Sequence, residues 1–200
     1  MQGQAWSLNE CSVKQYWQSH QSADLLHLAT HAVVDSTDAD LSYIGMADGE
    51  LIYSFEIANQ SLSPQMVTLS ACESSRGKSI PGEAELSLAR SYFQAGSQAV
   101  IASLWPVNDE STAQIMVKFY EELKEGIPKD QALRLAKEHY VDNADPAGRH
   151  PYYWAGFVAI GDMSPLTFKN NKGGLWLWIG LLVTVLLIGQ IFRISEREIK

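Results

Sequence analysis

The chain has 200 residues with a formal net charge of −8, and 46% of the residues are hydrophobic. This length allows about one domain of ordinary size, and the apolar share is large enough for a core, which excludes a disordered chain. The acidic charge and the lack of any Lys/Arg block longer than a pair exclude nucleic acid as an expected direct partner, because phosphate binding depends on clustered cations.

The first part of the chain predicts two buried strands. The N-terminus lacks the basic start and apolar stretch of a secretory signal, and residues 1–24 are interpreted as a remnant N-terminal segment. The run ADLLHLATH predicts a strand that ends at His31, and His27 within it is expected to be a buried structural histidine. The run MVTLSAC, which follows a Ser-Pro break, predicts a strand that ends at Cys72. Two core strands therefore end on an imidazole and a thiol.

The rest of the globular part alternates helices and strands. Helical spacing of apolar residues predicts helices over 82–96, 108–126 and 128–143, with Gly96 as the cap of the first. Between the first two helices, SQAVIASLW barely alternates and predicts a strand buried on both faces, and residues 150–162 supply a last short strand. Strands that alternate with helices in this way predict an α/β fold with a mainly parallel sheet.

The C-terminal end predicts a membrane anchor. Residues 175–192 carry no charge, and a helix of that length extends about 27 Å, close to the roughly 30 Å hydrocarbon thickness of a bilayer. Residues 164–174 are interpreted as a linker and 193–200 as a short basic tail. A buried core helix is the alternative interpretation. The basic residues around the span are too evenly placed to fix its orientation, and the lack of a signal peptide favours a cytoplasmic domain.

His31 and Cys72 form a candidate reaction centre. Ligands collect beyond the carboxyl ends of parallel strands, so both side chains emerge at one edge of the sheet if their strands are neighbours. An imidazole can take the proton of a thiol or stabilise the thiolate, and backbone N–H groups at Ala32 and Cys72 can stabilise an oxyanion. The residues alone leave a structural role open, because free Cys is often a core residue. Cys11 and Cys72 form no CxxC or Cys/His ligand pattern, so no disulfide framework or zinc site is indicated.

These motifs resemble the CHAT family, a group of caspase-like domains that often occur with tetratricopeptide repeats in bacteria. The resemblance covers about residues 25–162 and rests on HLATHA, VTLSACESSRG, the segment that begins GEAELSLARSYFQAG and ends KFYEELKEG, and HPYYWAGFVAIGD, in that order. It implies an α/β fold, a caspase-like three-layer sandwich with a mainly parallel sheet over residues 25–163, which the transmembrane helix would follow.

The resemblance also implies an activity and a site. His31 resembles the catalytic base and Cys72 the nucleophile, and Glu73 after the thiol fits the family pattern. The implied reaction is hydrolysis of a protein or peptide substrate, in bacterial defence, signalling or regulated cell death. A further implied partner is an upstream sensor such as a tetratricopeptide-repeat protein, and no cofactor is implied.

Two features depart from the family pattern. Ala32 stands where Gly is common in such folds, and only about two dozen residues precede the histidine strand, whereas related domains have further strands upstream. The loop SLWPVNDES is where caspase-like folds build part of the substrate pocket, so Trp105 and Asp109, together with Glu73, are pocket candidates. Asp109 could select Lys or Arg by charge, but a carboxylate at a helix N-terminus also has a purely structural role.

Two classes of function remain open. The first is a membrane-anchored cysteine endopeptidase, which the His and Cys residues favour. The second is a non-catalytic, membrane-tethered interaction module with a truncated caspase-like fold, which the short N-terminus favours.

Overall fold

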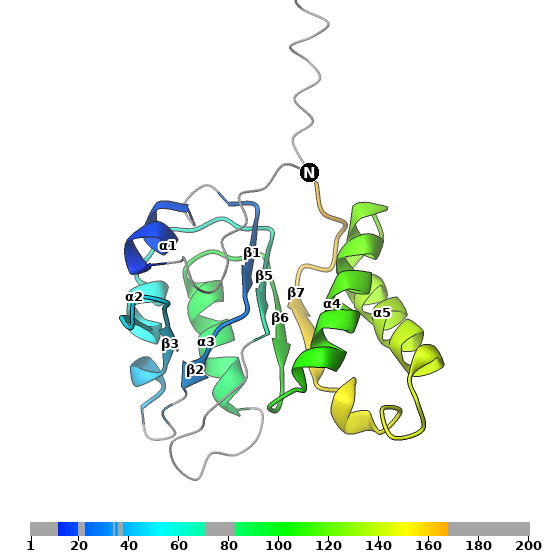
Figure 1. Cartoon of the computed structure of the whole chain (residues 1–200). Helices are drawn as coiled ribbons and strands as arrows, with labels where there is room; N and C mark the ends of the chain where they lie inside the picture. Colours follow the sequence, from blue (N-terminus) through cyan, green and yellow to red (C-terminus); the bar gives the residue numbers. More distant parts are fainter. Residues whose placement is uncertain (1–11, 20–22, 34, 36–37, 71–82, 168–200) are drawn as a thin grey trace, which may run out of the picture. The chain divides into compact units, whose positions relative to one another are not determined.

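A four-stranded sheet runs between two groups of helices in the computed structural model, which describes residues 12–19, 23–33, 35, 38–70 and 83–167 (Figure 1). Its strands, in spatial order, are β1 (Leu25–Leu28), β5 (Met66–Leu69), β6 (Ala99–Ser103) and β7 (Phe157–Gly161). The first three pair in parallel, whereas β7 is antiparallel to β6. The predicted mainly parallel sheet is confirmed and is consistent with a caspase-like fold.

The last strand is reversed because two helices separate it from β6. These helices, α4 (Asp109–Lys124) and α5 (Lys129–Asn143), pack against each other across a short turn. One crossover helix returns the chain to the end where a parallel strand begins, whereas a helical hairpin leaves it at the opposite end. The strand is also shorter than the predicted 150–162, because Pro151–Tyr153 form the 3-10 helix η3.

Helices cover both faces of the sheet. The predicted helices are present, the first as α3 (Glu83–Gln94). Alternate side chains of β5 enter two separate cores, as expected for a strand covered on both sides. Val67 packs in the core that contains Tyr92 of α3, and Met66 packs in the core that contains Phe119 of α4. The helix–sheet–helix order gives the three layers.

A second sheet follows β1 directly and was not predicted. It is antiparallel and consists of β2 (Ala32–Val33), β3 (Tyr43–Gly45) and β4 (Leu51–Tyr53), in that order. The 3-10 helix η2 (Ala39–Leu41) lies between β2 and β3, and α2 (Ser54–Ala58) follows β4. The central side chains of this sheet join the core that α3 lines.

The N-terminal segment contributes a helix to the same core. Helix α1 (Val13–Ser19) carries the buried Tyr16, whose hydroxyl lies 2.8 Å from the hydroxyl of the buried Tyr92. Burial raises the pKa of Tyr92, so this phenol is neutral at physiological pH. Part of the segment interpreted as a remnant therefore packs into the fold.

Two lysines of α5 hold the chain around β7. The Lys129 side chain is buried, and its Nζ donates to the carbonyl oxygens of Asp162 at 3.0 Å and Ser164 at 2.7 Å. Lys137 Nζ donates in the same way to the carbonyl oxygen of Phe157 at 2.5 Å. Burial lowers the pKa of both lysines, and the carbonyl acceptors compensate part of the lost hydration.

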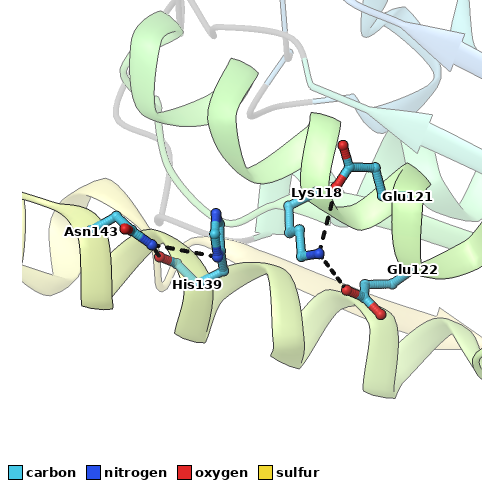
Figure 2. Close-up of polar contacts among 5 residues, drawn as sticks. All are labelled: Lys118, Glu121, Glu122, His139 and Asn143. Carbon is cyan, nitrogen blue, oxygen red and sulfur yellow. Dashed lines mark hydrogen bonds and ion pairs between the residues drawn. The ribbon is translucent and has the colours of Figure 1, made fainter.

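Polar side chains within α4 and within α5 make ordinary contacts between successive turns of one helix. Figure 2 shows Lys118, whose Nζ lies 2.7 Å from Glu122 and 3.5 Å from Glu121. On α5, Asn143 donates to the backbone carbonyl of His139 at 2.8 Å. Each of these contacts joins residues three or four positions apart in one helix, the spacing that supports a helix surface. His139 therefore interacts within its own helix.

The chain divides into two units, Met1–Leu166 and Thr167–Lys200. In the part of the chain that the structure describes, no helix combines the length and apolar character that crossing a membrane requires. The span predicted over 175–192 and the tail over 193–200 lie outside the described residues, as does most of the predicted linker.

Candidate functional site

The carboxyl ends of β1 and β5 form the candidate site. These two strands are neighbours in the sheet, with Leu25 opposite Met66 and Leu28 opposite Leu69, so paired residue numbers differ by 41. The Ser70 N–H donates to the carbonyl oxygen of Leu28 at 3.1 Å and extends this pairing past β5. His31 and Cys72 also differ by 41 in number. The condition for the predicted site, that the two strands are neighbours, is met, although Cys72 and Glu73 lie outside the described residues.

The backbone at His31 is held by β3 while its side chain is exposed. The Gly45 N–H donates to the carbonyl oxygen of His31 at 2.8 Å, and the Thr30 hydroxyl donates to the carbonyl oxygen of Gly45 at 2.6 Å. Strand β1 ends at Leu28, earlier than predicted, because the chain after Thr30 pairs with β3. His31 is therefore exposed at this edge of the sheet, while its main chain is held by β3.

Ala32 follows in β2 and packs its methyl group into the core, with 5% of the residue exposed. Because Gly45 hydrogen-bonds to His31, the alternation of an antiparallel ladder makes Ala32 and Ile44 a non-hydrogen-bonded pair. The Ala32 N–H is therefore directed away from β3. No non-glycine residue in the described ranges has a positive φ, so alanine meets no backbone strain at the position where the family commonly has glycine.

The predicted pocket residues Trp105 and Asp109 follow β6, at the same edge of the sheet as His31. The Trp105 Nε1–H donates to the carbonyl oxygen of Tyr152 at 2.9 Å, and its ring covers Gly156, where an added Cβ would lie 3.1 Å from it. Asp109 is exposed in the first turn of α4. Between described residues, no hydrogen bond or ion pair joins either side chain to His31.

His27 is an exposed residue, contrary to the prediction that it is buried, although part of its ring is covered by Tyr120. The residue is exposed because β1 is the edge strand of the described sheet and has a neighbour on one side only. Its Nε2 lies 2.8 Å from the Ser70 hydroxyl oxygen, and its ring packs on Tyr120 with 5.5 Å between ring centroids. Desolvation by this packing lowers the pKa of His27.

Four residues that shape this edge were not singled out in the sequence: Thr30, Gly45, Ser70 and Tyr120. The sequence MVTLSAC carries a signal for Ser70, because side chains two positions apart on a strand share a face and Ser70 therefore lies on the same face as Thr68. The others depend on pairing between segments that are distant in sequence. Among the residues that the structure describes, no group of three His, Cys, Asp or Glu side chains has a metal-binding arrangement.

Comparisons with known proteins agree with the motifs. The family model described as "CHAT domain" matches residues 5–162. Tetratricopeptide repeat protein 28 from Homo sapiens is 31% identical over 124 residues, which are 62% of this chain and 5% of that protein. Its Mus musculus counterpart is 30% identical over 124 residues, with the same two shares. The matched segment thus spans a small part of the curated relatives.

Proposed function

Because this chain belongs to the CHAT domain family, we propose that it is a caspase-like cysteine endopeptidase in which His31 activates the thiol of Cys72. One observation carries the proposal: β1 and β5 pair in parallel as neighbours, so the carboxyl ends of the strands that precede His31 and Cys72 lie at the same edge of the sheet. The exposed His31 ring, on a main chain that β3 fixes, supports it further.

The reaction proceeds by acyl transfer to sulfur. His31 takes the proton of the Cys72 thiol, and the thiolate attacks the scissile carbonyl carbon, so that a C–S bond forms and the carbonyl electrons move to oxygen. The N–H groups of Ala32 and Cys72 stabilise this oxyanion, and one such donor typically lowers a barrier by about 2.7–4 kcal/mol. The C–N bond then breaks, and His31 gives its proton to the leaving amine. In the second half, His31 takes a proton from water and the resulting hydroxide attacks the thioester carbonyl carbon. The C–S bond then breaks, the sulfur takes the proton back from His31, and the acid product is released.

The loop after β6 supplies the specificity of the proposed enzyme. Trp105 forms a wall of the pocket for the residue that precedes the cleaved bond, because its ring is tied to the carbonyl of Tyr152. Asp109 gives this pocket a negative charge and favours Lys or Arg. Glu73, next to the nucleophile, is proposed as a third pocket residue.

Peptide electrophiles test the dyad and the pocket together. In a Cys11→Ser background, we expect a peptide acyloxymethyl ketone to label the protein once, with Arg before the reactive group preferred over Leu. Cys72→Ala should abolish labelling, His31→Ala should slow it strongly, and Asp109→Asn should lower the preference for Arg. Mass spectrometry of the intact protein measures each rate. Labelling that both dyad substitutions leave unchanged would remove the protease function and leave the non-catalytic interaction module.

We also propose that residues 175–192 anchor the domain to a membrane, with the soluble part in the cytoplasm. In vesicles, the full chain should resist extraction by alkaline carbonate. The double substitution Leu182→Arg and Val185→Arg should release it, because each arginine adds about 2.5–3.5 kcal/mol to insertion near the centre of a span. The matched control replaces the same two residues by Ile and should stay in the membrane fraction. Equal extraction of both variants would contradict the anchor.

In this proposal the domain acts on a protein partner after an upstream sensor is triggered. Both relatives are tetratricopeptide repeat proteins by name, which supports an association with such repeats. The role in bacterial defence or regulated cell death stays a prediction from the family resemblance.

A further inference from the structure

A small polar cluster links β1, β5 and α4 directly below the candidate site. His27 Nε2 lies 2.8 Å from the Ser70 hydroxyl oxygen, across the β1–β5 pair. The hydroxyl of Tyr120 donates to Thr68 Oγ1 at 2.9 Å, and the rings of Tyr120 and His27 are in contact. Thr68 and Ser70 are both buried. The cluster is thus the polar exception on a strand whose other described side chains, Met66, Val67 and Leu69, are apolar and buried.

Among the residues that the structure describes, the cluster contains no charged partner for His27. Tyr120 is the titratable side chain that packs on it from α4, and burial raises the pKa of Tyr120 to about 12, so this phenol is neutral. From β5 the groups that face it are the hydroxyls of Thr68 and Ser70. Desolvation lowers the pKa of His27, so its imidazole is uncharged at neutral pH. An uncharged imidazole and a hydroxyl can form one hydrogen bond in which either group is the donor.

The position of this hydrogen bond gives it a further role. Ser70 is the last described residue after β5 and precedes Cys72 by two positions. His27 lies in β1 and Ser70 directly follows β5, the two strands that precede His31 and Cys72 in the sequence. We propose that His27 is a positioning residue, which holds the carboxyl end of β5 through Ser70 and so sets the geometry of Cys72 relative to His31. This inference deepens the proposed function and rests on it.

Thiol alkylation tests the inference without a substrate. In the Cys11→Ser background, the rate of Cys72 alkylation by iodoacetamide is measured across pH for His27→Phe, which keeps the ring contact, and for Ser70→Ala. Each variant should react about tenfold more slowly at neutral pH, with its profile moved to higher pH, because a small displacement of a reacting pair has a large effect on rate. The double variant should be no slower than either single one, since both remove the same bond. His27→Gln, which keeps a polar group near Nε2, should recover most of the rate.

The outcomes separate this inference from the dyad itself. If His31→Ala moves the alkylation profile but His27→Phe and Ser70→Ala do not, the positioning role is overturned and the dyad stands. If His31→Ala also leaves the profile unchanged, both are overturned. Near-UV circular dichroism identifies a variant that fails to fold, and His27→Gln and Ser70→Ala, which change few atoms, keep the comparison decisive.

Stability gives an independent check with a defined sign. The folded state holds the pKa of His27 below the unfolded value of 6.5, so the unfolded chain takes up this proton first as the pH falls. The stability associated with a neutral His27 is present above pH 6.5 and is lost as the pH falls through the folded-state pKa. The free energy of unfolding of the natural chain should therefore decrease more steeply below pH 6.5 than that of His27→Gln. Parallel curves would contradict the packed, neutral imidazole.

Discussion

His31→Ala is expected to lower kcat/KM for a peptide substrate by about 10²–10⁴-fold, the range that a positioned acid–base group contributes. The effect is large because His31 acts twice in each half of the proposed reaction, as the base that takes a proton and as the acid that returns it. Cys72→Ala should remove hydrolysis altogether, because the proposed acyl-enzyme forms on the Cys72 sulfur. Fluorogenic peptides with Arg before the cleaved bond provide the measurement.

The exposure of His31 allows a second test, in which added imidazole replaces the missing ring. A truncated histidine at an exposed position leaves a space that solvent can reach, so added imidazole should restore part of the activity of His31→Ala but none of that of Cys72→Ala. His139→Ala is the matched control, because His139 is exposed on α5 and contacts its own helix (Figure 2). Its activity should stay within about twofold of the natural chain, because a surface substitution away from the site usually changes the stability by no more than about 0.5 kcal/mol. Equal activity of His31→Ala and His139→Ala would contradict the dyad.

The helices and long strands were predictable because their signals are local. Apolar residues at helical spacing and a capping glycine mark α3, and Gly96 has a φ of +111°, which confirms the predicted cap. The reversal of β7 was also within reach of the sequence. Two consecutive helices were predicted before the last strand, and two helices return the chain to the end where it left the sheet.

The second sheet was missed because its strands have only two or three residues, too few to show a period. One signal was present, since Asp48-Gly49 separates β3 from β4 and this dipeptide is typical of a hairpin. Gly49 has a φ of +81°, as such a turn requires. That hairpin holds Gly45 against His31, so a correct prediction of it would also have improved the prediction of the site.

The chemical groups of the candidate site were predictable from the sequence, but the contacts that hold the surrounding residues in place were not. His31 and Cys72 were found because two apolar runs stop at a base and a thiol, and parallel strands end at a common edge. The exposure of His27 depends on how many strands flank β1, which one strand's own sequence does not encode. The hydrogen bond from the Thr30 hydroxyl to the Gly45 carbonyl oxygen likewise joins two segments that are distant in sequence, so no local pattern predicts it.

Gly96→Ala is expected to be strongly destabilising, with a loss of more than about 3 kcal/mol in the free energy of unfolding. Two effects add at this position. The φ of +111° lies in a region that side chains avoid, and an added Cβ would lie 2.2 Å from the carbonyl oxygen of Leu62. That contact is with backbone, so it cannot be relieved by a change of side-chain rotamer. Urea unfolding followed by circular dichroism measures the loss.

The clash has a structural consequence beyond strain. The Leu62 N–H donates to the carbonyl oxygen of Ala95 at 2.6 Å, and the Gln98 N–H donates to that of Pro64 at 3.0 Å. These two bonds align the chain segments that enter β5 and β6, so moving Leu62 away from residue 96 disturbs the start of both strands. The loss should therefore exceed the roughly 1–2 kcal/mol that a left-handed backbone alone costs a side chain.

Gly126→Ala separates the two effects. Gly126 has a φ of +80°, but no atom lies within 4 Å of an added Cβ, so the substitution introduces backbone strain without a clash. It should lower the free energy of unfolding by about 1–2 kcal/mol, clearly less than Gly96→Ala. Equal losses would mean that the Leu62 carbonyl can move aside, and the pairing before β5 and β6 would then not fix the register of those strands. A larger loss for Gly96→Ala would show that the pairing before β5 and β6 resists displacement, and β5 is the strand that precedes the proposed nucleophile in the sequence.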